Sequence, residues 1–225
     1  MGWTGQREGE VFDNEPLACS WLLVGIVAAC LLGSGWQQAG AQTLAPLPVA
    51  TRSLTPDGPA KPTRAWAQFC ERLPAECKVD LSEPETIRLT QAAWDKIVSI
   101  NKQVNLVIIA VPDQEHWGVQ DRWDYPDDGV GDCEDIQLLK RKLLAEAGLP
   151  RRALRMTVVL EEAGAGHAVL MARTDKGDLI LDNKRDAILP WKQTGYTYVK
   201  REGSGRSAWV WLNHPTSAVM VTANR

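Results

Sequence analysis

The second half of the chain alternates hydrophobic and polar positions with a period of two. Five short stretches follow this pattern and are separated by residues typical of turns: 154–161, 167–173, 179–182, 196–201 and 208–212. Such alternation is typical of strands that place one face on a hydrophobic core. The spacing therefore predicts a set of antiparallel strands in the C-terminal half.

Hydrophobic positions upstream of these strands have a helical period instead. A short helix is expected near Trp66 and Phe69. A long helix is predicted to begin at Ser82, with Pro84 in its first turn and Glu85 completing a capping box. Its apolar face consists of Ile87, Trp94, Ile97 and Val98.

A further helix is predicted over 133–147, because Gly148-Leu149-Pro150 supplies a stop signal after it. Between the two long helices lie a β-prone run at 106–111 and a loop at 116–131. Helices that precede an antiparallel sheet predict an α+β fold, in which the N-terminal helices pack on the sheet.

The first 41 residues form a different kind of sequence. Residues 17–35 are apolar and uncharged, and Ala39-Gly40-Ala41 has the small-x-small pattern of a cleavage site. We therefore predict a signal peptide over 1–41 and a periplasmic protein. The residues before the apolar run are acidic rather than basic, which is unusual for a signal peptide.

Two alternatives to a cleaved signal remain open. The apolar run is near the shortest length that spans a bilayer, so an uncleaved helix would anchor the protein in the inner membrane. Val27-Ala28-Ala29-Cys30 also loosely resembles a lipoprotein box. In either interpretation, residues 42–63 contain five prolines and no apolar periodicity, which predicts a flexible Pro-rich linker before a single domain at 64–225.

The charge of the chain does not indicate a polyanionic partner. The formal net charge is −3, and removal of residues 1–41 would bring it to zero by removing one basic and four acidic side chains. Since Lys and Arg form no cluster, nucleic acid is not an expected ligand.

Cysteine usage separates one thiol from the others. Cys70 and Cys77 enclose six residues, a loop short enough to close as a disulfide in an oxidising compartment. Export would also remove the two cysteines before residue 42, which leaves Cys133 without a partner. An odd cysteine in an exported protein indicates either a reactive thiol or a small buried hydrophobic side chain.

The position of Cys133 favours the reactive thiol. At the N-terminus of a helix, the helix dipole lowers the pKa of a thiol, but a nucleophile also needs a base and a group that orients the base. His116, His167 and His214 are the three histidines of the chain. His167 is favoured because a predicted hairpin brings an acid toward it.

The hairpin argument depends on the turn at 174–177. If Asp175 and Lys176 centre this turn, His167 lies opposite Lys184, and Asp182 is its diagonal neighbour on the same face. A one-residue change in the turn would put Asp182 on the other face. A structural histidine and a simple turn at Asp182 are the alternatives.

Carboxylates surround the candidate thiol. Asp132, Glu134 and Asp135 flank Cys133, and carboxylates beside a thiol raise its pKa. A positive charge must therefore offset them if Cys133 is a nucleophile. The imidazolium of His167 is one candidate and a bound calcium ion is another, because hard cations bind several carboxylate oxygens.

Several motifs of the chain resemble those of the bacterial transglutaminase-like cysteine proteinases. The motifs are His116-Trp117-Gly118, Asp121, Trp123-Asp124-Tyr125-Pro126, Gly131-Asp132-Cys133-Glu134-Asp135, Gly166-His167-Ala168-Val169-Leu170 and Leu181-Asp182-Asn183. The resemblance covers about residues 66–211. It implies a papain-like, transglutaminase-like fold and a triad of Cys133, His167 and Asp182.

The resemblance also implies partners and a cofactor. The LapG-type members of this family are periplasmic proteases that cut large surface adhesins, need calcium and are sequestered by an inner-membrane receptor for cyclic di-GMP. Their calcium ligands correspond here to Asp132 and Glu134, together with Asp135. The cysteine pair and the proline-rich start are closer to alphaproteobacterial relatives of that group.

Three functions follow as hypotheses. The first is an exported thiol protease that cleaves a periplasmic or surface protein and depends on calcium. The second keeps the thiol chemistry but transfers the acyl group to an amine, or hydrolyses a cell-wall amide. The third is a non-catalytic module that binds calcium or a peptide.

Overall fold

The computed structural model describes residues 45–213. The predicted signal peptide, or membrane anchor, and the candidate base His214 therefore lie outside the described residues. Within the described range, no helix combines the length and the hydropathy needed to cross a membrane.

A seven-stranded sheet forms the centre of the described domain. Its strand order is β1-β9-β8-β4-β5-β6-β7, and every neighbouring pair is antiparallel. The alternating stretches of the sequence correspond to the strands β4 (Leu154–Leu160), β5 (Gly166–Thr174), β6 (Gly177–Leu181), β8 (Thr197–Glu202) and β9 (Trp209–Trp211). Two short edge strands complete it, β1 (Pro59–Ala60) and β7 (Leu189–Pro190).

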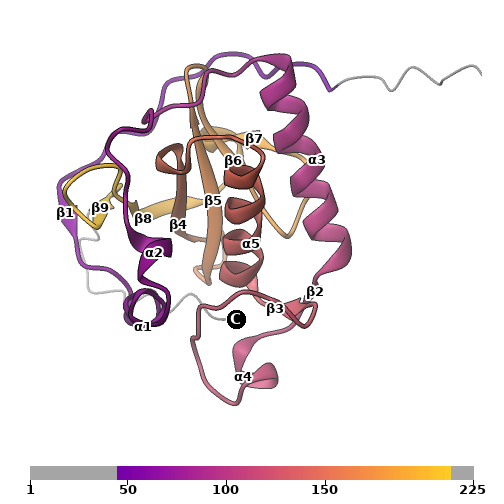
Figure 1. Cartoon of the computed structure of the whole chain (residues 1–225), viewed down its shortest axis with the longest axis vertical. Coiled ribbons are helices and arrows are strands. Elements are labelled where there is room, and N and C mark those ends of the chain that lie inside the picture. The colour runs from indigo at the N-terminus through magenta and orange to yellow at the C-terminus, as the bar shows by residue number, and fades with distance from the viewer. Residues whose placement is uncertain (1–44, 214–225) are drawn as a thin grey trace, which may run out of the picture. The chain divides into compact units, whose positions relative to one another are not determined.

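Two long helices cover one face of this sheet. Figure 1 shows α5 (Cys133–Glu146) lying over the central strands β4 and β5, with α3 (Gln91–Val107) beside it. The main hydrophobic core lies between these helices and the sheet and includes Trp94, Ile97, Leu138, Leu144, Met156, Val158, Leu170 and Leu181. The domain is therefore α+β, with helices packed on an antiparallel sheet, as the periodicity predicted.

Short elements surround this core. The helices α1 (Arg64–Arg72), α2 (Pro74–Cys77) and α4 (Asp113–His116) precede α5, and the strands β2 (Ile109–Ala110) and β3 (Val130–Gly131) pair with each other in parallel. Single turns of 3₁₀-helix occupy Arg151–Ala153 and Trp191–Gln193. The β-prone run at 106–111 thus forms a strand of only two residues, because α3 continues through Val107.

The predicted start of the long helix at Ser82 is wrong. Both the amide and the hydroxyl of Ser82 bond to the Asp80 carboxylate. The amide and carbonyl of Ile87 pair instead with the turn after β5, donating to Arg173 O and accepting from Asp175 N. The helix begins only after Thr90, whose hydroxyl accepts a hydrogen bond from Ala93 N at 3.2 Å and thereby caps α3.

The proline-rich stretch is not a free linker over residues 45–63. Thr51 N donates to Lys176 O at 2.8 Å and Leu54 N donates to an Asp178 carboxylate oxygen at 2.8 Å. Pro59 and Ala60 pair with β9. Backbone donors of this stretch thus bond to the sheet, a tertiary interaction that local composition does not reveal.

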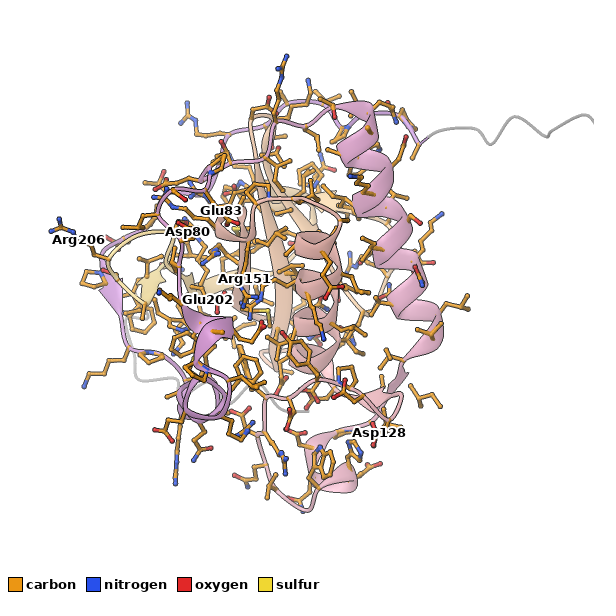
Figure 2. The ribbon with its side chains drawn as sticks, viewed as in Figure 1. Asp80, Glu83, Asp128, Arg151, Glu202 and Arg206 are labelled. Atoms are coloured by element: carbon orange, nitrogen blue, oxygen red, sulfur yellow. A yellow bond between two sulfur atoms is a disulfide. The ribbon has the colours of Figure 1, made fainter. Side chains whose placement is uncertain are left out.

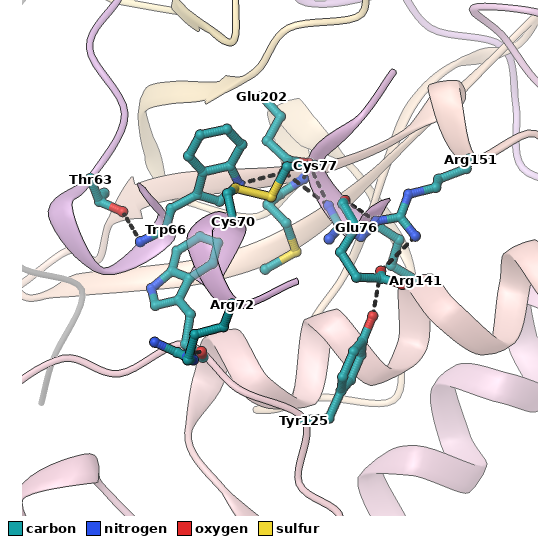
Figure 3. The surroundings of a disulfide bond; sticks show 12 residues. Thr63, Trp66, Cys70, Arg72, Glu76, Cys77, Tyr125, Arg141, Arg151 and Glu202 are labelled. Carbon is teal, nitrogen blue, oxygen red and sulfur yellow. Dashed lines mark hydrogen bonds and ion pairs between the residues drawn. A yellow bond between two sulfur atoms is a disulfide. The ribbon is translucent and has the colours of Figure 1, made fainter. Parts of the chain in front are cut away.

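A disulfide joins the first two helices of the domain. Cys70 in α1 and Cys77 at the end of α2 are bonded, with their Cα atoms 5.6 Å apart (Figure 3). The cysteine pairing expected from the sequence is therefore present in the structure.

Candidate active site

Cys133 is the first residue of α5 and is separated from the short strand β3 by Asp132 alone. Asp132 occupies the N-cap position, and Val111 N donates to Gly131 O at 3.1 Å, which holds the strand end in place. A Cβ atom on Gly131 would lie only 2.8 Å from Asp135 Cβ and 3.1 Å from Pro126 Cβ. The close approach of these segments requires glycine immediately before the Asp132-Cys133 pair.

The Cys133 sulfur contacts both its own helix and the neighbouring strand. Its thiol donates to Glu134 Oε2 at 3.0 Å, and Ala168 N of β5 donates to Sγ at 3.4 Å. Burial and the charge of Asp132 raise the pKa of the Cys133 thiol to about 12. In these surroundings the thiol is protonated at neutral pH, so a nucleophile here needs added positive charge.

His167 and Asp182 come together through the hairpin of β5 and β6. Thr174 pairs with Gly177 and Leu170 with Leu181, which is the register expected from the turn. His167 Nε2 lies 2.9 Å from Asp182 Oδ1, and both side chains are buried. Since Ala168 follows His167 directly, the imidazole lies on the same strand segment that contacts the Cys133 sulfur.

The other described histidine is engaged elsewhere. His116, at the end of α4, lies 2.9 Å from an oxygen of Asp128, the residue labelled in Figure 2 in the loop before β3. Its ring also lies 4.0 Å from that of Trp117.

Two further residues hold Asp182: Tyr196, which the sequence did not single out as a site residue, and Lys184, which the predicted hairpin placed opposite His167. The Tyr196 hydroxyl donates to Asp182 Oδ2 at 2.6 Å, and its ring lies edge-on to His167 at 5.7 Å. Lys184 N donates to Asp182 Oδ1 at 3.0 Å. Burial alone would raise the pKa of Asp182, but the hydrogen bonds and charge of His167, together with the Tyr196 hydroxyl, lower it to about 2.

The acidic residues beside Cys133 belong to a larger cluster. Asp113, Asp132 and Asp135 each offer an oxygen within 4.8 Å of one another, and so do Asp113, Asp121 and Glu134. Both Asp113 and Asp121 come from the segment before β3. The sequence did not single out Asp113, and it placed Asp121 among the family motifs but not among the metal ligands. Asp132, Glu134 and the Cys133 sulfur form a third such group, which places the thiol at the edge of this acidic cluster.

The donor set of the acidic cluster fits a divalent cation. One buried oxygen on each of Asp113, Asp121, Asp132 and Glu134 has no hydrogen-bond partner among the described residues. Burial and neighbouring carboxylates raise the pKa of Asp132 to about 7 and that of Asp135 to about 8. A hard cation with oxygen ligands would satisfy these atoms and keep the carboxylates ionised.

Comparison with known families decides the class of the protein. The family described as bacterial transglutaminase-like cysteine proteinase BTLCP matches residues 57–217, most of the chain. The chain belongs to this family. It is therefore a cysteine peptidase with a transglutaminase-like α+β fold. A search of curated proteins found no match.

Solved structures similar to this BTLCP proteinase come from Legionella pneumophila. EGTA-treated LapG is 24% identical over 53% of this chain and 66% of its own, with a TM-score of 0.45. Calcium-bound LapG is 19% identical over 69% of this chain and 92% of its own, again with a TM-score of 0.45. The matched part of the proteinase thus spans about two thirds of the length of the EGTA-treated LapG chain.

In this BTLCP proteinase, α3 holds the loop that carries Asp182. Asn105 Nδ2 lies 3.0 Å from Asp182 O, 3.2 Å from Arg185 O and 2.9 Å from Asp186 Oδ1. Asn101 Nδ2 donates to Asp186 O at 3.0 Å. The loop after β6 therefore depends on a helix that lies about 80 residues earlier in the sequence.

Proposed function

We propose that this proteinase cleaves a protein substrate with Cys133 as nucleophile, His167 as general base and acid, and Asp182 as the group that orients His167. The observation that carries the proposal is the 2.9 Å contact between His167 Nε2 and Asp182 Oδ1. The next residue of the same strand, Ala168, donates its amide to the Cys133 sulfur. Because Nε2 is engaged with Asp182, Nδ1 is the nitrogen left for proton exchange with the thiol.

The reaction follows from these positions. His167 takes the proton of Cys133, and the thiolate attacks the carbonyl carbon of the scissile peptide bond. The N–H groups of the first turn of α5, which have no acceptor within the helix, would stabilise the oxyanion that forms. His167 then protonates the leaving amine, the thioester remains on Cys133, and a water deprotonated by His167 hydrolyses it to a free acid.

Calcium binding belongs to the same proposal. Asp132, Glu134 and Asp135 would hold the ion together with Asp113 and Asp121, and the four unpartnered carboxylate oxygens support this assignment. When bound, the ion supplies positive charge beside the thiol, which offsets the carboxylates and lowers the thiol pKa. One of the Legionella LapG structures is described as calcium-bound.

Location and partners complete the proposal. The apolar run at 17–35 and the small residues at 39–41 support export to the periplasm, and a disulfide between Cys70 and Cys77 is suited to an oxidising compartment. We propose a large surface adhesin as the substrate and an inner-membrane receptor for cyclic di-GMP as the regulator, on the basis of the family motifs around Cys133.

Labelling with a thiol-directed, peptide-like inhibitor tests the triad. We expect wild-type protein in calcium to be labelled at Cys133, Cys133→Ala to lose labelling and cleavage, and Asp182→Asn to react on the order of 10²-fold or more slowly. His167→Ala should lose labelling, whereas His116→Ala, the matched control, should keep most of the rate. Circular dichroism would verify that each variant is folded.

The nature of the acceptor is tested with a fluorescent amine and the N-terminal region of an adhesin from the same organism. Release of a free acid supports proteolysis, while incorporation of the amine supports acyl transfer instead. Wild-type protein that binds calcium but neither labels nor cleaves would contradict the enzymatic assignment of these residues.

A further inference from the structure

The α1–α2 pair contacts the segment that leads into the acidic cluster. Arg72 Nη2 donates to Trp123 O at 2.5 Å and lies 3.7 Å from Asp124 Oδ2. The ring of Phe69 packs edge-on against Tyr125 at 6.0 Å. Helix α1 thus holds three consecutive residues, 123–125, through one hydrogen bond, one ion pair and one ring contact.

Helix α2 holds the same segment from a second direction. The Tyr125 hydroxyl donates to Glu76 Oε2 at 2.5 Å, and Arg151 Nη1 lies 2.7 Å from the same Glu76 oxygen (Figure 3). Arg151 and Glu202 are labelled beside α2 in Figure 2. Glu76 therefore joins α2 both to Tyr125 and to the turn before β4.

The segment at 123–125 in turn supports the carboxylates of the cluster. Asp124 N donates to Asp135 Oδ1 at 2.7 Å. Asp121, two residues before Trp123, contributes a buried oxygen that has no partner among the described residues. A shift of residues 123–125 would move the Asp124 amide away from Asp135 and change the position of Asp121.

The disulfide fixes the position of α2 relative to α1. Cys70 directly follows Phe69, and Cys77 directly follows Glu76, so each sulfur lies next to a residue that contacts Tyr125. Helix α2 has only four residues and no side-chain cap, and so short a helix does not persist without tertiary restraint. The bond to α1 is the covalent part of that restraint.

We propose that the Cys70–Cys77 disulfide is a positioning element for the cation site. It fixes α2 on α1, so that Arg72 and Glu76 together hold residues 123–125 where Asp121 and Asp135 face the other carboxylates. Opening the disulfide lowers the affinity for calcium. His167 and Asp182 stay in place, because β5, β6 and Tyr196 hold them. This inference rests on the proposed calcium site.

Calcium affinity measured by calorimetry tests the inference on the full domain with its disulfide intact or removed. For the double variant Cys70→Ser with Cys77→Ser we expect the Kd for calcium to rise about tenfold, comparable to the loss of one charge-assisted hydrogen bond. Terbium luminescence excited through tryptophan provides a second binding readout that needs no enzymatic activity.

Two further variants make the result specific. Tyr125→Phe and Arg72→Ala keep the disulfide. The first removes the hydrogen bond from α2 to residues 123–125 and the second removes the contacts of Arg72 with them, so each should also weaken calcium binding. They serve as the test if the double cysteine variant does not fold. Thr90→Ala removes the cap of α3 and lowers the stability of the domain, yet it should leave the Kd unchanged.

The outcomes separate this inference from the proposed function. A folded double-cysteine variant that binds calcium as tightly as the wild type would overturn the inference and leave the calcium site standing. If that variant does not fold, an unchanged Kd in both Tyr125→Phe and Arg72→Ala would overturn it. An equal loss of affinity in Thr90→Ala would also overturn it, because general destabilisation would then explain the effect. Wild-type protein that binds neither calcium nor terbium would overturn the calcium site itself.

Discussion

The Tyr196 hydroxyl donates a hydrogen bond to Asp182 Oδ2 at 2.6 Å, on the carboxylate oxygen opposite the one that faces His167. The Asp182 carboxylate is therefore held through both of its oxygens. Tyr196 fixes one oxygen, and the other contacts the imidazole of His167. Tyr196 lies outside the family motifs of the sequence, so only the structure relates it to the site.

Tyr196→Phe should lower kcat because Asp182 loses one of the groups that hold it. A hydrogen bond to a charged group contributes roughly 1.5–3 kcal/mol, so we expect a decrease of about tenfold. The pKa of Asp182, now about 2, should rise toward its ordinary value, which moves the acidic limb of the kcat/KM profile to higher pH. Tyr198→Phe is the matched control, because that hydroxyl lies 3.0 Å from Thr194 Oγ1 instead. An unchanged acidic limb in Tyr196→Phe would contradict this role.

Asn105→Ala should impair activity from outside the site. The variant removes the amide that contacts Asp182 O, Arg185 O and Asp186 Oδ1, and partly buried carbonyl groups left without a donor cost about 1–3 kcal/mol. We expect a loss of unfolding free energy in that range and a lower kcat with little change in KM. Gln103→Ala, an exposed position on the same helix, should leave both unchanged. Denaturant unfolding and steady-state kinetics would check the prediction.

Metal-free protein should become more stable as the pH falls from 8 to 5. The pKa of Asp132 is raised from 3.8 to about 7 and that of Asp135 from 3.8 to about 8. In this range the folded state takes up protons that the unfolded state does not, so stability is lost as the pH rises. We expect the melting temperature after chelation and desalting to drop by ~5 °C or more between pH 5 and pH 8.

Calcium should reverse that pH dependence, because the ion binds the ionised carboxylates and favours the folded state at high pH. Melting curves at each pH, with and without calcium, would measure both effects. A metal-free protein whose melting temperature is highest at pH 8 would disagree with the raised pKa values.

Glu202→Gln should destabilise the whole domain. Glu202 on β8 accepts hydrogen bonds from Arg141 Nη1 at 2.9 and 2.7 Å, from Trp66 Nε1 at 2.7 Å and from Met156 N at 3.1 Å. An amide places N–H groups against these donors and leaves the buried Arg141 without its counter-charge, at a cost of about 3–5 kcal/mol.

Glu85→Gln provides the matched control for Glu202→Gln. Glu85 also pairs with an arginine, Arg152 at 2.6 Å, but its side chain is 49% exposed. An exposed pair contributes less than about 1 kcal/mol, so this variant should unfold at nearly the wild-type urea concentration. Equal effects of the two substitutions would contradict the importance of burial for the pair between α5 and β8.

Local patterns determined much of the fold and the centre of the site. The period of two located five of the seven strands of the sheet, the stop at residues 148–150 bounded α5, and the turn at 174–177 related His167 to Asp182. These features depend on interactions within a few residues or across one tight hairpin, so the order of residues specifies them directly.

Contacts between distant segments were decided only by the tertiary structure. The helix α3 begins after Thr90 and not at the predicted Ser82, because Ile87 pairs with the turn after β5. Asp113, Tyr196 and Asn105 reach the site through chain folding over many residues, which leaves no periodicity or spacing to detect. The sequence by itself determined which groups are chemically able to act. Tertiary packing decided which of them meet, because hydrogen bonds across the core depend on positions in space and not on separation along the chain.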